Sequence, residues 1–264
     1  MFAWWRRRRD ARALAERPVP DDIWQATLER YPFIGLRDAG DLVALRRLAT
    51  LFLDRKQFHG AGGLRVDDAM AVAVAAQACL PVLHLGLGAY DGFVGIVMHP
   101  DEVVASRSVQ DETGIVHEYD EVLAGEAMQG GPVMLSWQDV AHAGEHPEGA
   151  YNVVIHEFMH VLDMVEGEPD GVPPLPREID RRHWVQVLEA ALGQLERAVD
   201  AGRATVLDPY GCEGLDEFFP VAAEAFFVAP HGLRDEAPAL YDLLSRYFRQ
   251  DPAAVLPRPD AEST

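Results

Sequence analysis

The sequence has very little cysteine, with only Cys79 and Cys212 among its 264 residues. Two thiols do not make the disulfide framework that is typical of small secreted proteins, and each is expected to be a buried or unreactive side chain. The low cysteine content therefore favours a reducing compartment, and we expect a cytoplasmic protein.

Positive charge and long apolar runs are also scarce. The chain carries 23 basic against 43 acidic residues, a formal charge of -20, which disfavours direct nucleic-acid binding and attraction to anionic membranes. No apolar run reaches the length of about 18 residues that a membrane span needs. The N-terminal MFAWWRRRRD has no apolar core after its arginines, so no secretory signal is predicted.

Apolar residues, in contrast, make up 48% of the chain, which is enough for a sizeable core. We expect a single folded domain over residues 21–252. A frayed or helical N-terminal segment at 1–20 would precede it, and a loose C-terminal tail at 253–264 would follow it.

The spacing of apolar residues predicts an α+β protein that is mainly helical, with a small mixed sheet. Helical spacing occurs at 41–59, 70–83, 184–198 and 215–227, and short strand-like runs occur at 93–98, 115–122 and 132–137. The last run comes just before the most informative helix. We expect Pro132–Trp137 to be a sheet edge that pairs with an extended peptide; the alternative is an ordinary covered edge.

That helix is YNVVIHEFMHVLD, Tyr151–Asp163, which contains the pattern H-E-x-x-H as His156, Glu157 and His160. Because a helix has 3.6 residues per turn, the two imidazoles point the same way and can reach one ion at about 2.0–2.1 Å. Glu157 is turned by about 100° from His156, which places its carboxylate beside the ion to take a proton from a metal-bound water. The pattern predicts metal-assisted hydrolysis of an amide.

The alternative is that His156 and His160 are satisfied core residues, one turn apart by chance in a chain with ten histidines. The flanking residues argue against this. The apolar residues at 153–155, 158, 161 and 162 predict a helix that is buried on most sides. Two imidazoles and a carboxylate buried there need polar partners, and a metal ion supplies one.

Two histidines do not complete a zinc site, which needs a third protein ligand and keeps a fourth position for water. The predicted helix at 215–227 carries two acids, Glu217 and Glu224, which are seven residues apart and so lie on nearly the same face. From the residues alone either acid is a candidate ligand, or each forms a local cap or salt bridge. Asp163, three residues after His160, lies where it can accept a hydrogen bond from a ligand imidazole.

Several segments carry a resemblance to a known family. They are HEFMHVLDMVEG at 156–167, DPY at 208–210, EFF and EAFF at 217–219 and 224–227, KQFHGAGGLRVDDAMAVAVAAQACL at 56–80 and LSW at 135–137. Together they resemble the zinc-dependent peptidases of the Mlc titration factor A family, over about residues 20–252. Around the metal these proteins are also similar to the catalytic domain of anthrax lethal factor, another gluzincin.

The resemblance implies a zincin-like fold with one zinc ion per chain, bound by His156, His160 and Glu217. It implies Glu157 as the general base and Tyr210 as donor to the oxyanion of the tetrahedral intermediate, a role typically worth a few kcal/mol. Glu224 would then be an acid behind the ligands or in the core. Pro220 follows EFF where a small residue is expected, and proline can disturb a helix interior.

The resemblance also implies aminopeptidase-like hydrolysis of a peptide or protein substrate. The best-known member of the family binds and inactivates Mlc, a repressor that controls glucose uptake, so a Mlc-like repressor is a candidate partner. Two alternatives stay open. One is a regulatory protein that sequesters a transcription factor and has a mainly structural zinc site, and the other is a helical scaffold with fortuitous histidines.

Overall fold

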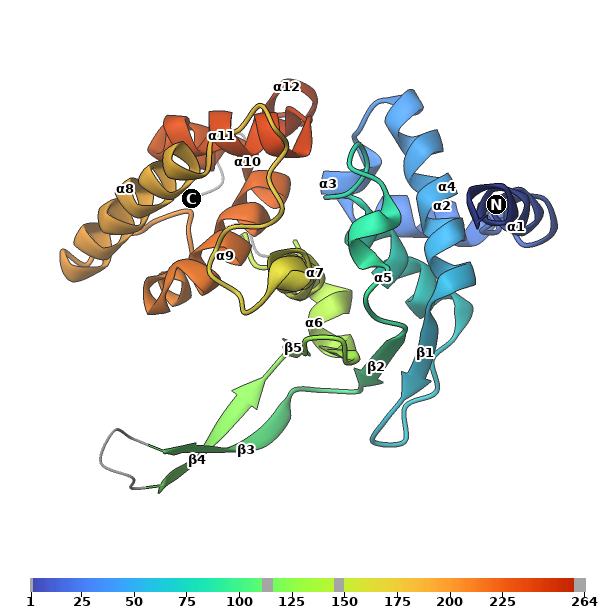
Figure 1. Cartoon of the computed structure of the whole chain (residues 1–264), viewed down its shortest axis with the longest axis horizontal. Coiled ribbons are helices and arrows are strands. Elements are labelled where there is room, and N and C mark those ends of the chain that lie inside the picture. The colour runs from blue at the N-terminus through green and yellow to red at the C-terminus, as the bar shows by residue number, and fades with distance from the viewer. Residues whose placement is uncertain (1, 111–115, 145–149, 259–264) are drawn as a thin grey trace.

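The computed structural model describes residues 2–110, 116–144 and 150–258, and they are mostly helical with a small mixed sheet (Figure 1). This confirms the α+β class. The N-terminal helices are α1 (Phe2–Glu16), α2 (Asp21–Arg30), α3 (Pro32–Gly35), α4 (Ala39–Arg55) and α5 (Asp68–Cys79). The C-terminal helices are α8 (Arg181–Asp200), α9 (Leu215–Val228), α10 (Pro230–Glu236), α11 (Pro238–Phe248) and α12 (Pro252–Val255).

Helix α7 (Val153–Asp163) lies between these two groups, packed against α5 on one side and α9 on the other (Figure 1). Short α6 (Trp137–His142) precedes it, and the 3-10 turns are η1 (Leu87–Tyr90), η2 (Met164–Glu166) and η3 (Pro209–Glu213). The central position explains the composition of α7, because a helix covered on both sides needs apolar residues around most of its circumference.

The sheet has four strands in the order β1-β2-β6-β5. These strands are β1 (Gln57–Gly60), β2 (Gly95–His99), β6 (Val133–Ser136) and β5 (Gly125–Ala127). β2 pairs in parallel with β1 and with β6, and β5 pairs antiparallel to β6. A separate antiparallel ribbon of β3 (Val103–Gln110) and β4 (Val116–Leu123) extends away from the helices in Figure 1.

The prediction that Pro132–Trp137 is a sheet edge is wrong. The strand in this segment, β6, has β2 on one side and β5 on the other, so it lies in the interior of the sheet. Its apolar residues Val133 and Leu135 are almost fully buried, as an interior strand requires. The edge strand on this side is β5, which has only three residues and therefore gives no periodic signal in the sequence.

The other predicted elements are found with shifted ends. The run at 93–98 is β2, and the run at 115–122 is β4, although residue 115 lies outside the described part of the chain. The helix predicted over 41–59 ends at Arg55, and its last predicted residues form β1 instead. The helix predicted over 70–83 ends at Cys79. Leu80 still has helical backbone angles, but Pro81 has no N–H to donate to the carbonyl of Gln77 and so cannot continue the helical hydrogen bonds.

The core around α7 is aromatic. Phe158 is fully buried, with the rings of Tyr90, Phe52 and Phe93 at centroid distances of 5.0, 5.6 and 5.8 Å. Burying a phenylalanine contributes about 1.5–3 kcal/mol, and tilted ring pairs add to that. These contacts fix the apolar side of α7, so its histidines are presented in one orientation on the opposite side.

The two ends of the described chain are also helical. Helix α1 packs against α4, where Arg55 donates to Asp10 at 2.9 Å. The predicted C-terminal tail, 253–264, begins inside α12, and its last residues, 259–264, lie outside the described part. Among the described helices none combines the length and the apolarity that crossing a membrane requires.

Candidate metal centre

The side chain that caps the N-terminus of helix α7 also forms a hydrogen bond to a neighbouring helix. Asn152 is the N-cap, and its Oδ1 accepts from the backbone N–H of Ile155 at 2.9 Å. Its Nδ2 donates to Oε1 of Gln77 on α5 at 2.8 Å. An N-cap typically contributes about 1 kcal/mol of stability. Here its hydrogen bond to Gln77 also fixes the position of α7 along α5. His156 follows one turn after the cap.

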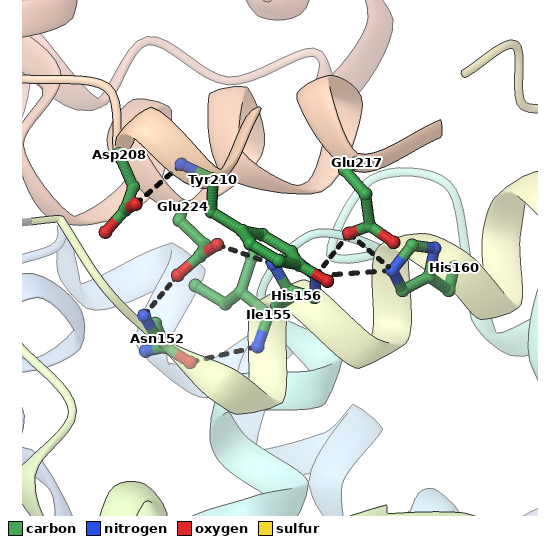
Figure 2. A network of polar contacts seen from close by, with 8 residues as sticks. All are labelled: Asn152, Ile155, His156, His160, Asp208, Tyr210, Glu217 and Glu224. Atoms are coloured by element: carbon green, nitrogen blue, oxygen red, sulfur yellow. Dashed lines mark hydrogen bonds and ion pairs between the residues drawn. The ribbon is translucent and has the colours of Figure 1, made fainter. Parts of the chain in front are cut away.

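Helix α9 supplies the carboxylates. It continues through Pro220 from Leu215 to Val228, so the proline does not break the spacing between Glu217 and Glu224. Figure 2 shows both acids projecting from α9 toward α7, one on each side of His156. The second helix therefore presents two carboxylates to one imidazole.

The side chains of His156, His160 and Glu217 converge on one point (Figure 2). Oε2 of Glu217 is 3.1 Å from Nε2 of His156 and 3.3 Å from Nε2 of His160, and the two Nε2 atoms are 3.2 Å apart. Ligands at about 2.0–2.1 Å from a tetrahedral zinc ion lie about 3.3–3.4 Å from one another. The donor set and its spacing therefore fit a divalent metal ion of this size.

Glu224 lies on the other side of His156. Its Oε1 is 2.8 Å from Nδ1 of His156, and its Oε2 accepts from the backbone N–H of Asn152. A carboxylate at Nδ1 favours a proton there and leaves Nε2 free to bind a metal. The structure thus separates the two acids that the sequence left open, because Glu217 joins the cluster and Glu224 orients one of its imidazoles.

Charge compensation within the cluster shifts the pKa values of its members. Burial alone would raise the pKa of Glu217, but hydrogen bonds from His156 and His160 lower it to about 2. Burial alone would lower the pKa of His156, but Glu217 and Glu224 raise it well above its usual value. Imidazoles and carboxylates bind metal in their deprotonated forms, so a metal ion bound here would compete with protons for these groups.

Glu157 stands apart from the cluster and lines the cavity beside it. This cavity has a volume of about 340 Å³ and is also lined by His156, Tyr210 and Gly125. Glu157 is 5% exposed, and its Oε2 has no hydrogen-bond partner among the described residues. Burial raises the pKa of Glu157 to about 7, although both histidines lower it. A buried carboxylate with a free oxygen is suited to accept a proton from a bound molecule.

Tyr210 approaches the cluster from η3. Asp208 caps this turn by accepting from the backbone N–H of Tyr210 at 2.9 Å. The tyrosine ring lies 5.9 Å from the ring of His156, and its hydroxyl points toward the metal-binding side chains (Figure 2). Tyr210 is 41% exposed and lines the cavity beside the cluster.

Asp163 has different partners from those that the sequence predicted. Its two carboxylate oxygens accept from the backbone N–H groups of Gly171 at 2.7 Å and Val172 at 2.9 Å. Asp163 therefore ties the loop after α7 to the helix, and Glu224 takes the place beside a ligand imidazole. Burial raises the pKa of Asp163 to about 6, although the backbone hydrogen bonds lower it.

Sequence reasoning missed Asn152 and Gly125. The signal for Asn152 was present, because asparagine directly before an apolar helical run is a common N-cap. Nothing in the sequence marked Gly125, which an antiparallel strand brings next to Glu157.

These features define a class: an α+β protein with a metal-binding set of two histidines one helical turn apart and a carboxylate from a second helix. Comparison with known families agrees with this class. The profile of the glucose-regulated metallo-peptidase M90 family matches residues 2–249. The chain belongs to this family.

Relatives support the same assignment. Mlc titration factor A of Pectobacterium atrosepticum is 34% identical over 236 residues, which are 88% of each chain. Mlc titration factor A of Edwardsiella ictaluri is 37% identical over 209 residues, 78% of each chain. An uncharacterised protein of Synechocystis sp. is 34% identical over 241 residues, 90% of this chain and 87% of its own.

Substituting each of the two acids on α9 in turn is expected to separate their roles. Glu217→Gln should lose most of the bound metal because a ligand is removed, whereas Glu224→Gln should weaken metal affinity by about 10–100-fold because it acts through His156. Metal content after dialysis against graded chelator measures both. Glu213→Gln, an exposed acid at the end of η3, is the control. Equal losses in the two α9 variants would contradict the assignment.

Asp163→Asn is expected to destabilise the protein by about 1–3 kcal/mol, because an amide NH₂ group would then face a backbone N–H that needs an acceptor. Denaturant unfolding of the metal-free protein measures this change. Metal affinity should stay within about threefold of the wild type. A loss of metal affinity without a loss of stability would instead support the role beside an imidazole that the sequence predicted.

Proposed function

We propose that this chain is a zinc-dependent peptidase with a zincin-like fold, acting in the cytoplasm. The observation that carries the proposal is the convergence of His156, His160 and Glu217 beside the buried carboxylate of Glu157 and an open cavity. Family membership supports a metallopeptidase. The imidazole and carboxylate donors at this spacing favour zinc, because they suit its tetrahedral geometry.

A zinc ion in this site would act as a Lewis acid, lowering the pKa of water to about 7 and polarising the substrate carbonyl. Glu157 accepts the proton of the attacking water with its free carboxylate oxygen and then returns it to the leaving amine. Its side chain is held for this by burial between α7 and β5. Tyr210 donates a hydrogen bond from its hydroxyl to the carbonyl oxygen as negative charge develops there.

The free edge of β5 offers a place for the substrate backbone. Among the described residues β5 pairs only with β6, and the carbonyl of Ala124 accepts from the N–H of Ser136. Because hydrogen-bonding direction alternates along an antiparallel strand, the N–H and C=O groups of Gly125 and Ala127 point to the outer edge. An extended peptide that paired there would pass Glu157, which supports this edge as the binding site.

Acidic groups in the cavity support an aminopeptidase-like preference. Glu102 and Asp208 line the cavity and are exposed, and the described lining contains no lysine or arginine. A wall of one charge sign attracts the opposite charge. The free ammonium of a substrate N-terminus would fit such a wall when the first peptide bond lies beside Glu157.

A second candidate function is regulatory binding. The relatives named Mlc titration factor A suggest that this chain could bind a Mlc-like transcriptional repressor of sugar uptake. In that case the metal site would mainly stabilise the structure, and binding would survive the loss of Glu157 as a base.

Glu157→Gln is expected to lower peptide hydrolysis by about 10²–10⁴-fold, because the amide cannot accept the proton from water. Metal content should remain near one ion per chain, since Glu157 is outside the cluster. Steady-state cleavage of a peptide library and elemental analysis measure the two effects. The exposed Glu166→Gln variant is the control. Undiminished hydrolysis in Glu157→Gln would refute the peptidase mechanism, and binding of a repressor retained by both variants would favour the regulatory candidate.

A further inference from the structure

The sheet approaches the catalytic helix closely at Gly125, the first residue of β5. A Cβ atom built on Gly125 would lie 2.6 Å from both Cγ and Oε1 of Glu157 and 2.8 Å from its Cδ. Carbon atoms that are not bonded pack best at about 3.5–4.0 Å. The space that any other residue would need for its side chain is therefore occupied by the Glu157 carboxylate.

Backbone conformation does not explain this glycine. Gly125 is absent from the described glycines with positive φ and lies in a regular antiparallel pair opposite Leu135. An alanine could adopt such a conformation without strain. Only the close approach to Glu157 requires that the side chain be missing.

Neither partner can easily move away. The position of Cγ is set by the first side-chain torsion of Glu157, so relief of the clash requires a different rotamer or a shift of β5. Glu157 is buried in a helix whose backbone is fixed by the core. β5 is held to β6 by the paired residues 125–127 and 133–135 and by the bond from Ser136 N to Ala124 O at 2.6 Å.

We propose that Gly125 is a positioning residue for Glu157: the missing side chain in edge strand β5 leaves the pocket in which this carboxylate is held beside the metal-binding cluster. The catalytic part of this inference rests on the proposed function. The edge strand thus has two tasks, since the same residue offers its backbone to the substrate and its empty side-chain position to the base.

Gly125→Ala is expected to lower kcat by about 10²-fold, the size of effect that a displacement of about 1 Å produces, with KM and metal content within about threefold of the wild type. Gly95→Ala is the matched control, because this glycine also lies in the sheet but a Cβ there would meet Pro132 at an ordinary 3.4 Å. Unchanged kcat in Gly125→Ala, or an equal loss in the control, would overturn the proposal.

A double-mutant cycle tests the contact without any need for activity. Glu157→Ala removes Cγ, Cδ and both carboxylate oxygens, so Gly125→Ala should lower the unfolding midpoint of the metal-free protein in the wild-type background and lower it much less in the Glu157→Ala background. Equal shifts in both backgrounds would mean that the methyl group disturbs the strand alone and would overturn the proposal. If the wild type hydrolyses no peptide, the proposed function fails, while the cycle still decides whether Gly125 positions Glu157.

Discussion

The structure of the site depends on one imidazole held between two carboxylates. His156 has Glu224 at Nδ1 and Glu217 at Nε2, and both acids come from α9. Burying a histidine and two carboxylates is unfavourable unless each finds a partner of opposite charge. Each group finds its partner only at one distance between α7 and α9 and one rotation of each helix about its axis. The metal-binding geometry and the helix packing therefore determine each other.

Packing on both sides of α7 maintains this position. Asn152 and Gln77 connect α7 to α5, and Glu224 accepts from the backbone of Asn152, so hydrogen bonds run from α5 through the start of α7 to α9. Fully buried aromatic side chains fill the space behind them, Phe158 on α7 and several phenylalanines on α9. Polar contacts set the direction of the side chains, while the apolar core supplies the stability that keeps them buried.

Local patterns in the sequence predicted a large part of the site. The pairing of His156 and His160 with Glu157 beside them follows from helical periodicity alone, and the spacing of Glu217 and Glu224 placed both acids on one face. Choosing between these acids required the family resemblance or the structure, because the periodicity of α9 does not say which turn meets His160. The same argument placed Asp163 beside a ligand imidazole, but its carboxylate oxygens accept hydrogen bonds from the backbone of the loop at 171–172. The order of the sheet was not predictable, since the edge strand β5 has three residues and its pairing depends on contacts distant in sequence.

We infer that one divalent ion binds where α7 and α9 meet. Crystallographic anomalous scattering at the zinc absorption edge tests it most directly. We expect one anomalous peak per chain, at about 2.0–2.1 Å from Nε2 of His156, from Nε2 of His160 and from a carboxylate oxygen of Glu217. A peak bound by Glu224 in place of Glu217, or no peak at this position in protein supplied with zinc, would contradict it.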